Sequence, residues 1–215
     1  MNGLSKYYIK KIITSFSEEQ TATDTSRKLK VNRNTVNKYY RMIREAVADY
    51  QEILLSGQTR NGNAHTYHLY WHKSTGLTTL PSDDAIAFYL TLLNGKVYVE
   101  EKNMDKIKNL SGEGDAAAAP KEELVVHELN IDAVEQKPLH ARTGMDKSLE
   151  LAYVFFIYAK EKLTKFYGVK EEYSYLYLKE LEFRFNNRDK DLSQIVWKIL
   201  PHHSPEWVKT NKFRK

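Results

Sequence analysis

Hydrophobic residues recur at helical spacing through the first part of the chain and predict three helices, over residues 6–16, 21–29 and 32–55. In the third helix Val36 and Tyr40 are four residues apart, so they fall on one face, while polar residues fill the opposite face. We therefore expect a small helical head in which the third helix keeps one face in solvent.

After a linker-like stretch at residues 57–64, the long helical segments give way to shorter apolar segments. Residues 65–72 are rich in aromatic side chains and predict a strand, whereas the apolar run 85–93 fits either a strand or a helix. The dipeptide Asn94-Gly95 before residues 96–100 is a strong β-hairpin signal. We therefore expect a small sheet in the middle of the chain.

Helical periodicity returns at Asp146, where a long apolar face begins and Gly168 offers a C-cap. Two further helices are predicted over residues 171–187 and 192–200, the last of them ending at Pro201. The helix over 171–187 is apolar almost all round, which predicts burial on two sides.

These patterns together predict an α/β fold that is rich in helix and has three consecutive parts. They are a helical head over residues 1–56, a strand-containing region over 57–145 and a C-terminal helical part over 146–215. A flexible Gly/Ala-rich loop is expected at residues 111–120, and a short strand at 124–131.

The exposed face of the third predicted helix carries side chains that suit nucleic-acid recognition. Arginine forms paired hydrogen bonds with guanine, asparagine forms them with adenine, and lysine contacts backbone phosphates. The candidates for the major groove are Arg33, Asn34, Asn37, Lys38 and Arg41. The candidates for the DNA backbone are Lys6, Lys10, Lys11 and Arg44. Asn32 precedes the helix as a good N-cap.

The charge distribution also favours a nucleic-acid partner. From Arg27 to Arg44 there are seven Lys or Arg and no Asp or Glu, whereas a solvated helix face usually mixes both signs. Residues 1–56 hold ten basic and six acidic side chains, residues 57–146 nine and thirteen, and residues 147–215 fourteen and nine. The basic ends therefore suit phosphates. The alternative is a basic surface helix in a three-helix bundle.

The turn between the second and third predicted helices has Lys30 where glycine is usual, because this turn often needs a positive φ. A lysine in that conformation costs on the order of 1 kcal/mol. Ser26, Leu29 and Val31 occupy the places where helix-turn-helix units pack one helix on the next.

The 215 residues are 41% hydrophobic and 28% charged, which fits a soluble protein with a sizeable core. The absence of cysteine excludes disulfides and thiolate metal sites. No apolar run approaches the length of a membrane span, and the N-terminal residues lack a signal-peptide core. We therefore expect a cytoplasmic protein without membrane contact.

Six segments can be compared with a known family, at residues 9–13, 21–23, 31–40 (VNRNTVNKYY), 94–98, 159–169 and 176–188. Together they resemble small bacterial insertion-sequence transposases of the DDE class over roughly half of the chain. The resemblance implies an N-terminal helix-turn-helix that binds double-stranded DNA. It also implies a ribonuclease-H-like catalytic sheet covered by C-terminal helices.

The catalytic motifs of that family are not matched. Its first carboxylate lies in a strand reading DESYFGG, but the stretch from Tyr67 to Gly76 holds no carboxylate, and the Thr-Asp-Gly-Trp turn of the second is missing. At the third site Glu150 falls on the family's Asn and Tyr153 on its Glu, so Glu150 is the candidate catalytic residue. Because two-metal chemistry needs several carboxylates, the resemblance implies a DNA-binding relative without intact cleavage activity.

Two alternatives stay open. An active transposase would cleave and transfer DNA strands with Mg²⁺ as cofactor, combining Glu150 with carboxylates such as Asp83, Asp84 and Asp132. A helical protein-interaction module would not bind DNA. A symmetric DNA site would need a homo-oligomer, for which no heptad run gives a prediction.

The spacing of three histidines, His65, His68 and His72, resembles that of zinc ligands. On a strand, however, His68 and His72 share one face and His65 points the other way. Without a nearby cysteine or a His-Glu-x-x-His motif, the residues favour an aromatic-rich strand surface and no resident metal.

Overall fold

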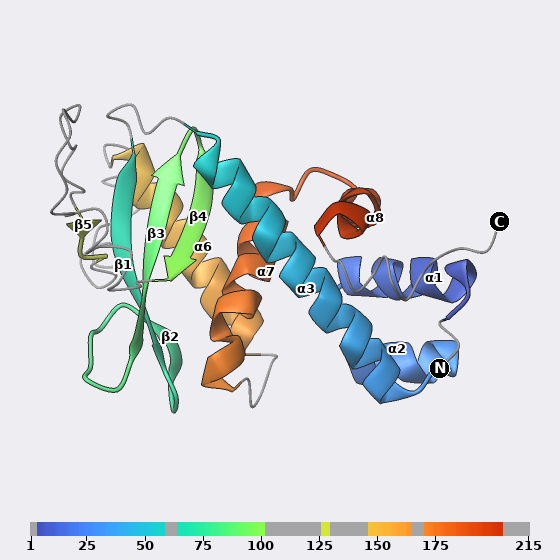
Figure 1. The fold of residues 1–215 in the computed structure, drawn as a ribbon. Helices are drawn as coiled ribbons and strands as arrows, with labels where there is room; N and C mark the ends of the chain where they lie inside the picture. Colours follow the sequence, from blue (N-terminus) through green and yellow to red (C-terminus); the bar gives the residue numbers. More distant parts are fainter. Residues whose placement is uncertain (1–3, 59–63, 102–125, 130–145, 165–169, 204–215) are drawn as a thin grey trace, which may run out of the picture. The chain divides into compact units, whose positions relative to one another are not determined.

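The computed structural model describes residues 4–58, 64–101, 126–129, 146–164 and 170–203 (Figure 1). The protein is a mixed α/β structure of helices and one small sheet. The expected loop at 111–120 lies outside the described residues, as does half of the expected strand at 124–131.

The chain forms two compact units rather than three consecutive parts. The helical unit consists of residues 1–59 and 179–215, and the sheet unit consists of residues 60–178. The predicted C-terminal part is therefore divided between the units. The reason is that α8 (Leu192–His203) contributes Val196 and Leu200 to the same hydrophobic core as the N-terminal helices.

The helical unit contains α1 (Lys6–Ser17), α2 (Ala22–Leu29), α3 (Arg33–Ser56), the later part of α7 (Ser174–Asn186) and α8. Its core is fully buried at Ile9 and Ile12 of α1, Val36 and Ile43 of α3, and Phe183 of α7. The first three helices lie where their apolar spacing predicts them.

The ends of α2 and α3 are set by local chemistry. The Thr21 hydroxyl accepts a hydrogen bond from the Asp24 amide at 3.1 Å, and the Asn32 side chain accepts one from the Asn34 amide at 2.8 Å. Lys30 ends α2 with a φ of +54°, as its place in the turn predicts. The strained lysine thus gives the chain its sharp reversal between the two helices.

The last helix differs from its prediction, because α8 continues through Pro201 to His203. A proline lacks a backbone N–H, so it removes one helical hydrogen bond. In the final turn of α8 only this single bond is lost, and the helix tolerates the residue.

The sheet unit is built on β1 (His65–His72), β2 (Gly76–Thr78), β3 (Ile86–Leu93), β4 (Lys96–Glu101) and β5 (Val126–His127). The order is β2-β1-β3-β4 with antiparallel neighbours, and β5 pairs with β1 in parallel. The apolar run that fitted either a strand or a helix is the strand β3, because it pairs with β1 on one side and β4 on the other. The short strand β2 was not predicted.

The hairpin between β3 and β4 turns at Asn94 and Gly95, with φ values of +53° and +72°. Two consecutive positive φ angles are the requirement of a type I′ turn, which matches the twist of paired strands. The Asn-Gly prediction is therefore confirmed, and the turn fixes the register Leu93 opposite Lys96.

The two faces of the sheet differ in chemistry. One face is apolar and includes Leu69, Phe88, Leu90 and Val97, and the ring of Phe88 stacks on Tyr175 at 6.3 Å between centroids. The other face is polar and aromatic; it carries Thr66, His68, Tyr70, Tyr89, Thr91, Tyr98 and Glu100. This alternation follows from the two-residue period of strands.

The helix α6 (Lys147–Leu163) packs against β2, β3 and β4 and runs behind the strands in Figure 1. It begins at Asp146, whose side chain accepts a hydrogen bond from the Ser148 amide at 2.9 Å. A short 3₁₀ turn, Glu171–Tyr173, precedes α7. Of the described helices, none is long and apolar enough to cross a membrane.

Candidate nucleic-acid interface

The N-terminal half of α3 presents a polar, basic face to solvent. The five residues predicted for the major groove are all exposed, and these are Arg33, Asn34, Asn37, Lys38 and Arg41. These five residues are called the exposed row of α3; within it Arg33, Asn37 and Arg41 follow at intervals of four. Val36 and Tyr40, between them, are buried at 0% and 4% exposure. The structure therefore brings the predicted set together on one helix face.

The beginning of α3 is electropositive for a second reason. The first turn contains no acidic side chain to offset the partial positive charge of the helix N-terminus. Arg33 adds a full charge at the same end. An anion such as a backbone phosphate is favoured at this position.

One acidic side chain lies close to the exposed row. The Arg41 Nε donates to Glu45 at 2.7 Å, and both side chains are largely exposed. An exposed pair at this spacing contributes about 0.3–0.5 kcal/mol. The interaction is therefore weak enough for Arg41 to exchange Glu45 for another anion.

Arg44 is placed differently from the other candidates. Its side chain is 12% exposed, and its Nε donates to the Glu180 carboxylate at 2.6 Å. Its guanidinium thus takes part in an internal ion pair rather than standing on the exposed face of α3. The pattern near Arg44 gives no sign of this, because the partner is 136 positions away in the sequence.

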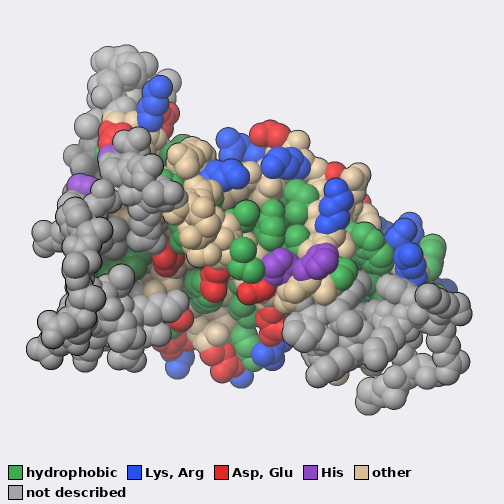
Figure 2. Space-filling view, turned by 45° about the horizontal axis from the view of Figure 1, so that its top comes forward, with side chains coloured by type: hydrophobic (Ala, Val, Ile, Leu, Met, Phe, Trp, Pro, Cys, Tyr) green, Lys and Arg blue, Asp and Glu red, His purple; other side chains and the backbone are tan. Residues whose placement is uncertain are grey.

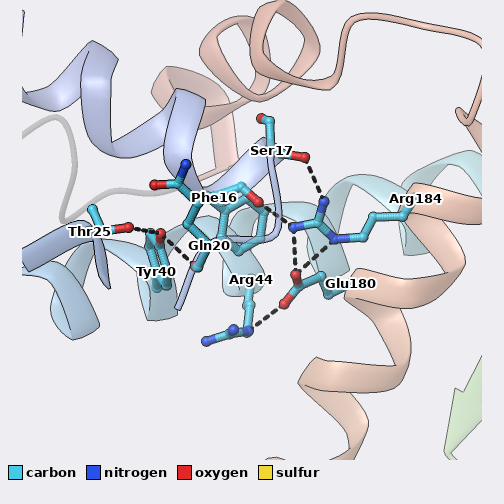
Figure 3. A network of polar contacts seen from close by, with 8 residues as sticks. All are labelled: Phe16, Ser17, Gln20, Thr25, Tyr40, Arg44, Glu180 and Arg184. Carbon is cyan, nitrogen blue, oxygen red and sulfur yellow. Dashed lines mark hydrogen bonds and ion pairs between the residues drawn. The ribbon is translucent and has the colours of Figure 1, made fainter. Parts of the chain in front are cut away.

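Glu180 is the centre of a buried polar network that fixes the helices around α3 (Figure 3). Arg184 donates to the same carboxylate at 2.7 Å and to the carbonyls of Phe16 and Ser17 at 2.6 and 3.1 Å. These carbonyls belong to the last turn of α1, where the Phe16 carbonyl also accepts a hydrogen bond from the Glu19 amide at 3.0 Å. The Glu180 network, defined here as Arg44, Glu180, Arg184 and the two carbonyls, therefore ties α1, α3 and α7 together.

The electrostatics of the network favour the charged form of Glu180. Burial alone would raise the pKa of this carboxyl, but the guanidinium groups of Arg44 and Arg184 outweigh burial and hold the pKa below its ordinary value. The carboxylate is consequently ionised at neutral pH and is shared between two guanidinium cations.

Tyr40 makes a second bridge, between α3 and α2. Its hydroxyl donates to the Gln20 carbonyl at 3.0 Å and accepts a hydrogen bond from the Thr25 hydroxyl at 2.8 Å (Figure 3). Burial raises the pKa of Tyr40 above its ordinary value, so the hydroxyl keeps its proton. The bridge sets the orientation of α3 relative to the helix before it.

A third buried group joins α7 to the C-terminal part of α3. Lys179 and Glu182 form an ion pair of 2.7 Å with both side chains at 0% exposure, and Gln51 donates to Glu182 at 2.6 Å. Residue patterns did not identify these positioning residues. The only signal was the presence of charged residues inside a helix that is otherwise apolar all round.

The three lysines predicted for the DNA backbone are exposed on α1. The ammonium groups of Lys6 and Lys10 lie 5.9 and 5.4 Å from the centre of the Trp197 ring, and that of Lys11 lies 5.8 Å from the ring of Tyr7. These distances are within the range of cation–π attraction. The lysines are thus held beside aromatic rings.

The candidate catalytic residue stands apart from these groups. Glu150 is exposed in the first turn of α6, within the sheet unit. Asp83 and Asp84 are exposed near the start of β3, and Asp132 lies outside the described residues. The hydroxyl of Ser82 lowers the pKa of Asp84 by hydrogen bonding, an effect of a turn. The structure does not bring Asp83 or Asp84 into a cluster with Glu150 that would hold a metal.

The three histidines of β1 lie beside separate carboxylates. His65 is 3.9 Å from Asp146, His68 is 2.8 Å from Glu128, and His72 is 3.1 Å from Asp84. His68 lies on the polar face of the sheet, where its ring stacks on Tyr89. Within the part of the chain that the structure describes, no group of three or more His, Asp or Glu side chains is placed to hold a metal ion.

Comparison of the chain with protein-family models, with curated proteins and with solved structures returned no match. The functional assignment therefore rests on the residues of the chain itself.

Proposed function

We propose that this chain is a DNA-binding protein related to insertion-sequence transposases, and that α2 and α3 act as a helix-turn-helix on duplex DNA. The observation that carries the proposal is the exposed row on α3, which combines Arg, Asn and Lys side chains with an uncompensated helix N-terminus. The sharp turn at Lys30 and the Tyr40 bridge support it, because a reading helix needs a fixed orientation.

In this proposal α3 enters the major groove with its N-terminal half. Arg33 and Asn37 contact base edges, where guanidinium and amide groups form paired hydrogen bonds. Lys38 and Arg41 lie farther along the same face, and Lys10 of α1 contacts a backbone phosphate. Sequence preference then comes from α3, and overall affinity comes from the lysines.

The sheet unit is compatible with the proposed family relationship, but we propose no catalytic activity for it. Its mixed sheet, with α6 packed against three strands, suits a ribonuclease-H-like relic. The strand β1 has no carboxylate where the resemblance requires the first catalytic one. The proposed function is therefore DNA binding without cleavage.

The test starts by selecting a preferred site from random duplex DNA with the full chain. Competition binding then compares this site with unrelated duplex for the wild type, Asn37→Ala and Lys10→Ala. Asn37→Ala should lower the preference for the selected site about 5- to 100-fold, since a base contact contributes about 1–3 kcal/mol of discrimination. Lys10→Ala should weaken binding to both duplexes equally.

The matched control is Lys147→Ala, which removes an exposed lysine from the sheet unit. It should leave both affinities unchanged. Equal, sequence-blind losses from Asn37→Ala and Lys10→Ala would overturn base reading by α3. Failure of the wild type to bind duplex DNA at low salt would overturn the proposed function as a whole.

A further inference from the structure

A second surface of the helical unit combines aromatic rings with positive charge. Tyr7 is 64% exposed and Tyr8 is 38% exposed, and they are the two most exposed aromatic side chains among the described residues. Their rings meet edge to face, with centroids 5.5 Å apart. Large aromatic side chains exposed side by side are typical of binding surfaces rather than of solvated helix faces.

The two helices that form this surface contribute lysines and no carboxylates. Neither α1 nor α8, two helices that pack on each other, contains an Asp or a Glu within its bounds. Together they carry four lysines, which are Lys6, Lys10, Lys11 and Lys198. Figure 2 shows basic and hydrophobic side chains adjoining one another over the helical unit. The surface therefore suits a polyanion that also has flat apolar groups.

The lysines are positioned rather than extended at random. Trp197 of α8 is partly buried against the core, and its ring holds the ammonium groups of Lys6 and Lys10. The hydroxyphenyl rings of Tyr7 and Tyr8 lie next to these lysines in the sequence of α1. Helical spacing places Tyr7 and Lys11 on the outer face of α1, between the Lys6–Lys10 pair beside Trp197 and the ring of Tyr8.

We infer that this α1–α8 surface, formed by Tyr7, Tyr8, Trp197 and the four lysines, binds single-stranded DNA. Unpaired bases stack on the rings of Tyr7 and Tyr8, while Lys6, Lys10 and Lys11 contact the phosphates between them. Duplex DNA offers no free base faces to these rings, because its bases are already stacked. The surface shares the lysines of α1 with the proposed duplex contact, but its tyrosines lie outside the exposed row of α3, so base stacking on them adds a second DNA-binding mode.

The decisive variants keep the charge and change the rings. The double variant Tyr7→Leu with Tyr8→Leu retains helix-forming residues and removes the stacking surfaces. Its matched control is Tyr7→Phe with Tyr8→Phe, which retains both rings. Circular dichroism melting of the full chain verifies that both variants fold as the wild type does.

Binding is measured by fluorescence anisotropy with labelled oligo(dT) and with a mixed-sequence hairpin duplex. The leucine variant should bind oligo(dT) about tenfold or more weakly, since stacking contributes about 1–3 kcal/mol per base. The phenylalanine variant should bind within about threefold of the wild type, and duplex affinity should stay unchanged in both. Equal losses in the two variants, or no binding of oligo(dT) by the wild type, would overturn the inference.

The salt dependence gives an independent readout. Each phosphate contact removed from a single-stranded complex lowers the slope of log K against log salt by about 0.7. Lys6→Gln with Lys10→Gln should therefore lower the slope for oligo(dT) by about 1.4. The control pair Lys73→Gln with Lys147→Gln, on exposed positions of the sheet unit, should leave it unchanged. An unaltered slope in the α1 pair would refute the phosphate contacts.

The two proposals fail separately. Asn37→Ala should lose duplex preference and keep its affinity for oligo(dT). If the wild type binds oligo(dT) but no duplex, the result agrees with single-strand binding by the α1–α8 surface and contradicts the proposed function of α3. A leucine variant that loses oligo(dT) and duplex binding alike would assign the tyrosines to the duplex and overturn the second mode.

Discussion

The helical unit and the sheet unit both remove polar side chains from water, but they do so with different chemistry. In the helical unit Lys179 and Glu182 are charged and fully buried, and Glu180 is 3% exposed. In the sheet unit the fully buried polar pair is Thr66 and Thr91, whose hydroxyls are 3.2 Å apart. The helical unit thus adds paired charges to buried hydroxyls such as that of Thr25, whereas the Thr66–Thr91 pair of the sheet unit is neutral.

The difference shows what each kind of group contributes. A buried charge tolerates only a partner of the opposite sign, so Glu180 selects Arg44 and Arg184 and fixes three helices. A hydroxyl accepts and donates with many partners: Thr66 donates to Thr91, and Thr91 donates to Glu100. Charges therefore specify the arrangement of the helical unit, while the strand register already specifies that of the sheet.

The largest loss of stability is expected when the buried charge of Glu180 is removed. Glu180→Gln should lower the free energy of unfolding of the helical unit by about 3–5 kcal/mol, because two buried guanidinium groups lose their carboxylate. Urea titration followed by circular dichroism at the helical band measures the change. Asp189→Asn, which changes an exposed carboxyl between α7 and α8, should change it by less than about 0.5 kcal/mol. A loss below 1 kcal/mol at Glu180 would contradict the assigned role.

Lowering the pH should remove the charge of Glu180 in the wild-type protein and so lower its free energy of unfolding. The pKa of Glu180 is lower in the folded chain than its ordinary value of 4.5, so the unfolded chain binds its proton first as the pH falls. The stabilisation is complete above pH 4.5 and is lost as the pH falls through the folded pKa. Unfolding titrations between pH 7 and 3 should therefore show a fall in stability that is smaller in Glu180→Gln. Parallel curves for the two proteins would rule this out.

A smaller effect is expected at the Tyr40 bridge. Tyr40→Phe keeps the ring in the core but leaves the Gln20 carbonyl without its donor, which should cost about 1–2 kcal/mol. Thermal unfolding compared with Tyr7→Phe, whose hydroxyl is on an exposed side chain, isolates this contribution. The two variants should differ clearly, and identical melting curves would mean that the bridge does not stabilise α3.

The smallest effect is expected in the sheet unit. Replacing Thr66 and Thr91 together by valine removes both hydroxyls of the pair. The Glu100 carboxylate loses the Thr91 donor but is only partly buried and can turn to water, so the free energy of unfolding should change by less than about 1 kcal/mol. Thr91→Val alone leaves the Thr66 hydroxyl buried and should cost more than the double variant. Chemical denaturation of the three proteins measures the order. If the double variant lowers the free energy of unfolding as much as Glu180→Gln does, the two units do not differ in how strongly they depend on their buried polar groups.

The sequence predicted what depends on near neighbours and missed what depends on distant ones. Asn32 and the spacing of Val36 and Tyr40 define α3 locally, so its bounds and its buried face followed from the pattern. The apolar run of β3 was ambiguous, because only pairing with β1 and β4 decides between strand and helix.

The residues of the candidate site likewise include some that the local pattern places correctly and some whose position depends on distant partners. The exposed row on α3 needed only helical periodicity, and all five of its residues lie where the pattern places them. Arg44 belongs to the same basic run, yet its position is decided by Glu180, which follows after the whole sheet unit. The pairing of Arg184 with the last turn of α1 gave no local signal either.

The discontinuity of the helical unit has a consequence for how the protein is made. Synthesis releases α1, α2 and α3 first, but their core still lacks Phe183, Val196 and Leu200, which arrive after the sheet unit. Until then Arg44 has no carboxylate and the apolar stripes of the first helices have no complete cover. The first three helices are therefore expected to complete their fold only after α7 and α8 have been synthesised, whereas the sheet unit is a contiguous segment that is free to fold earlier.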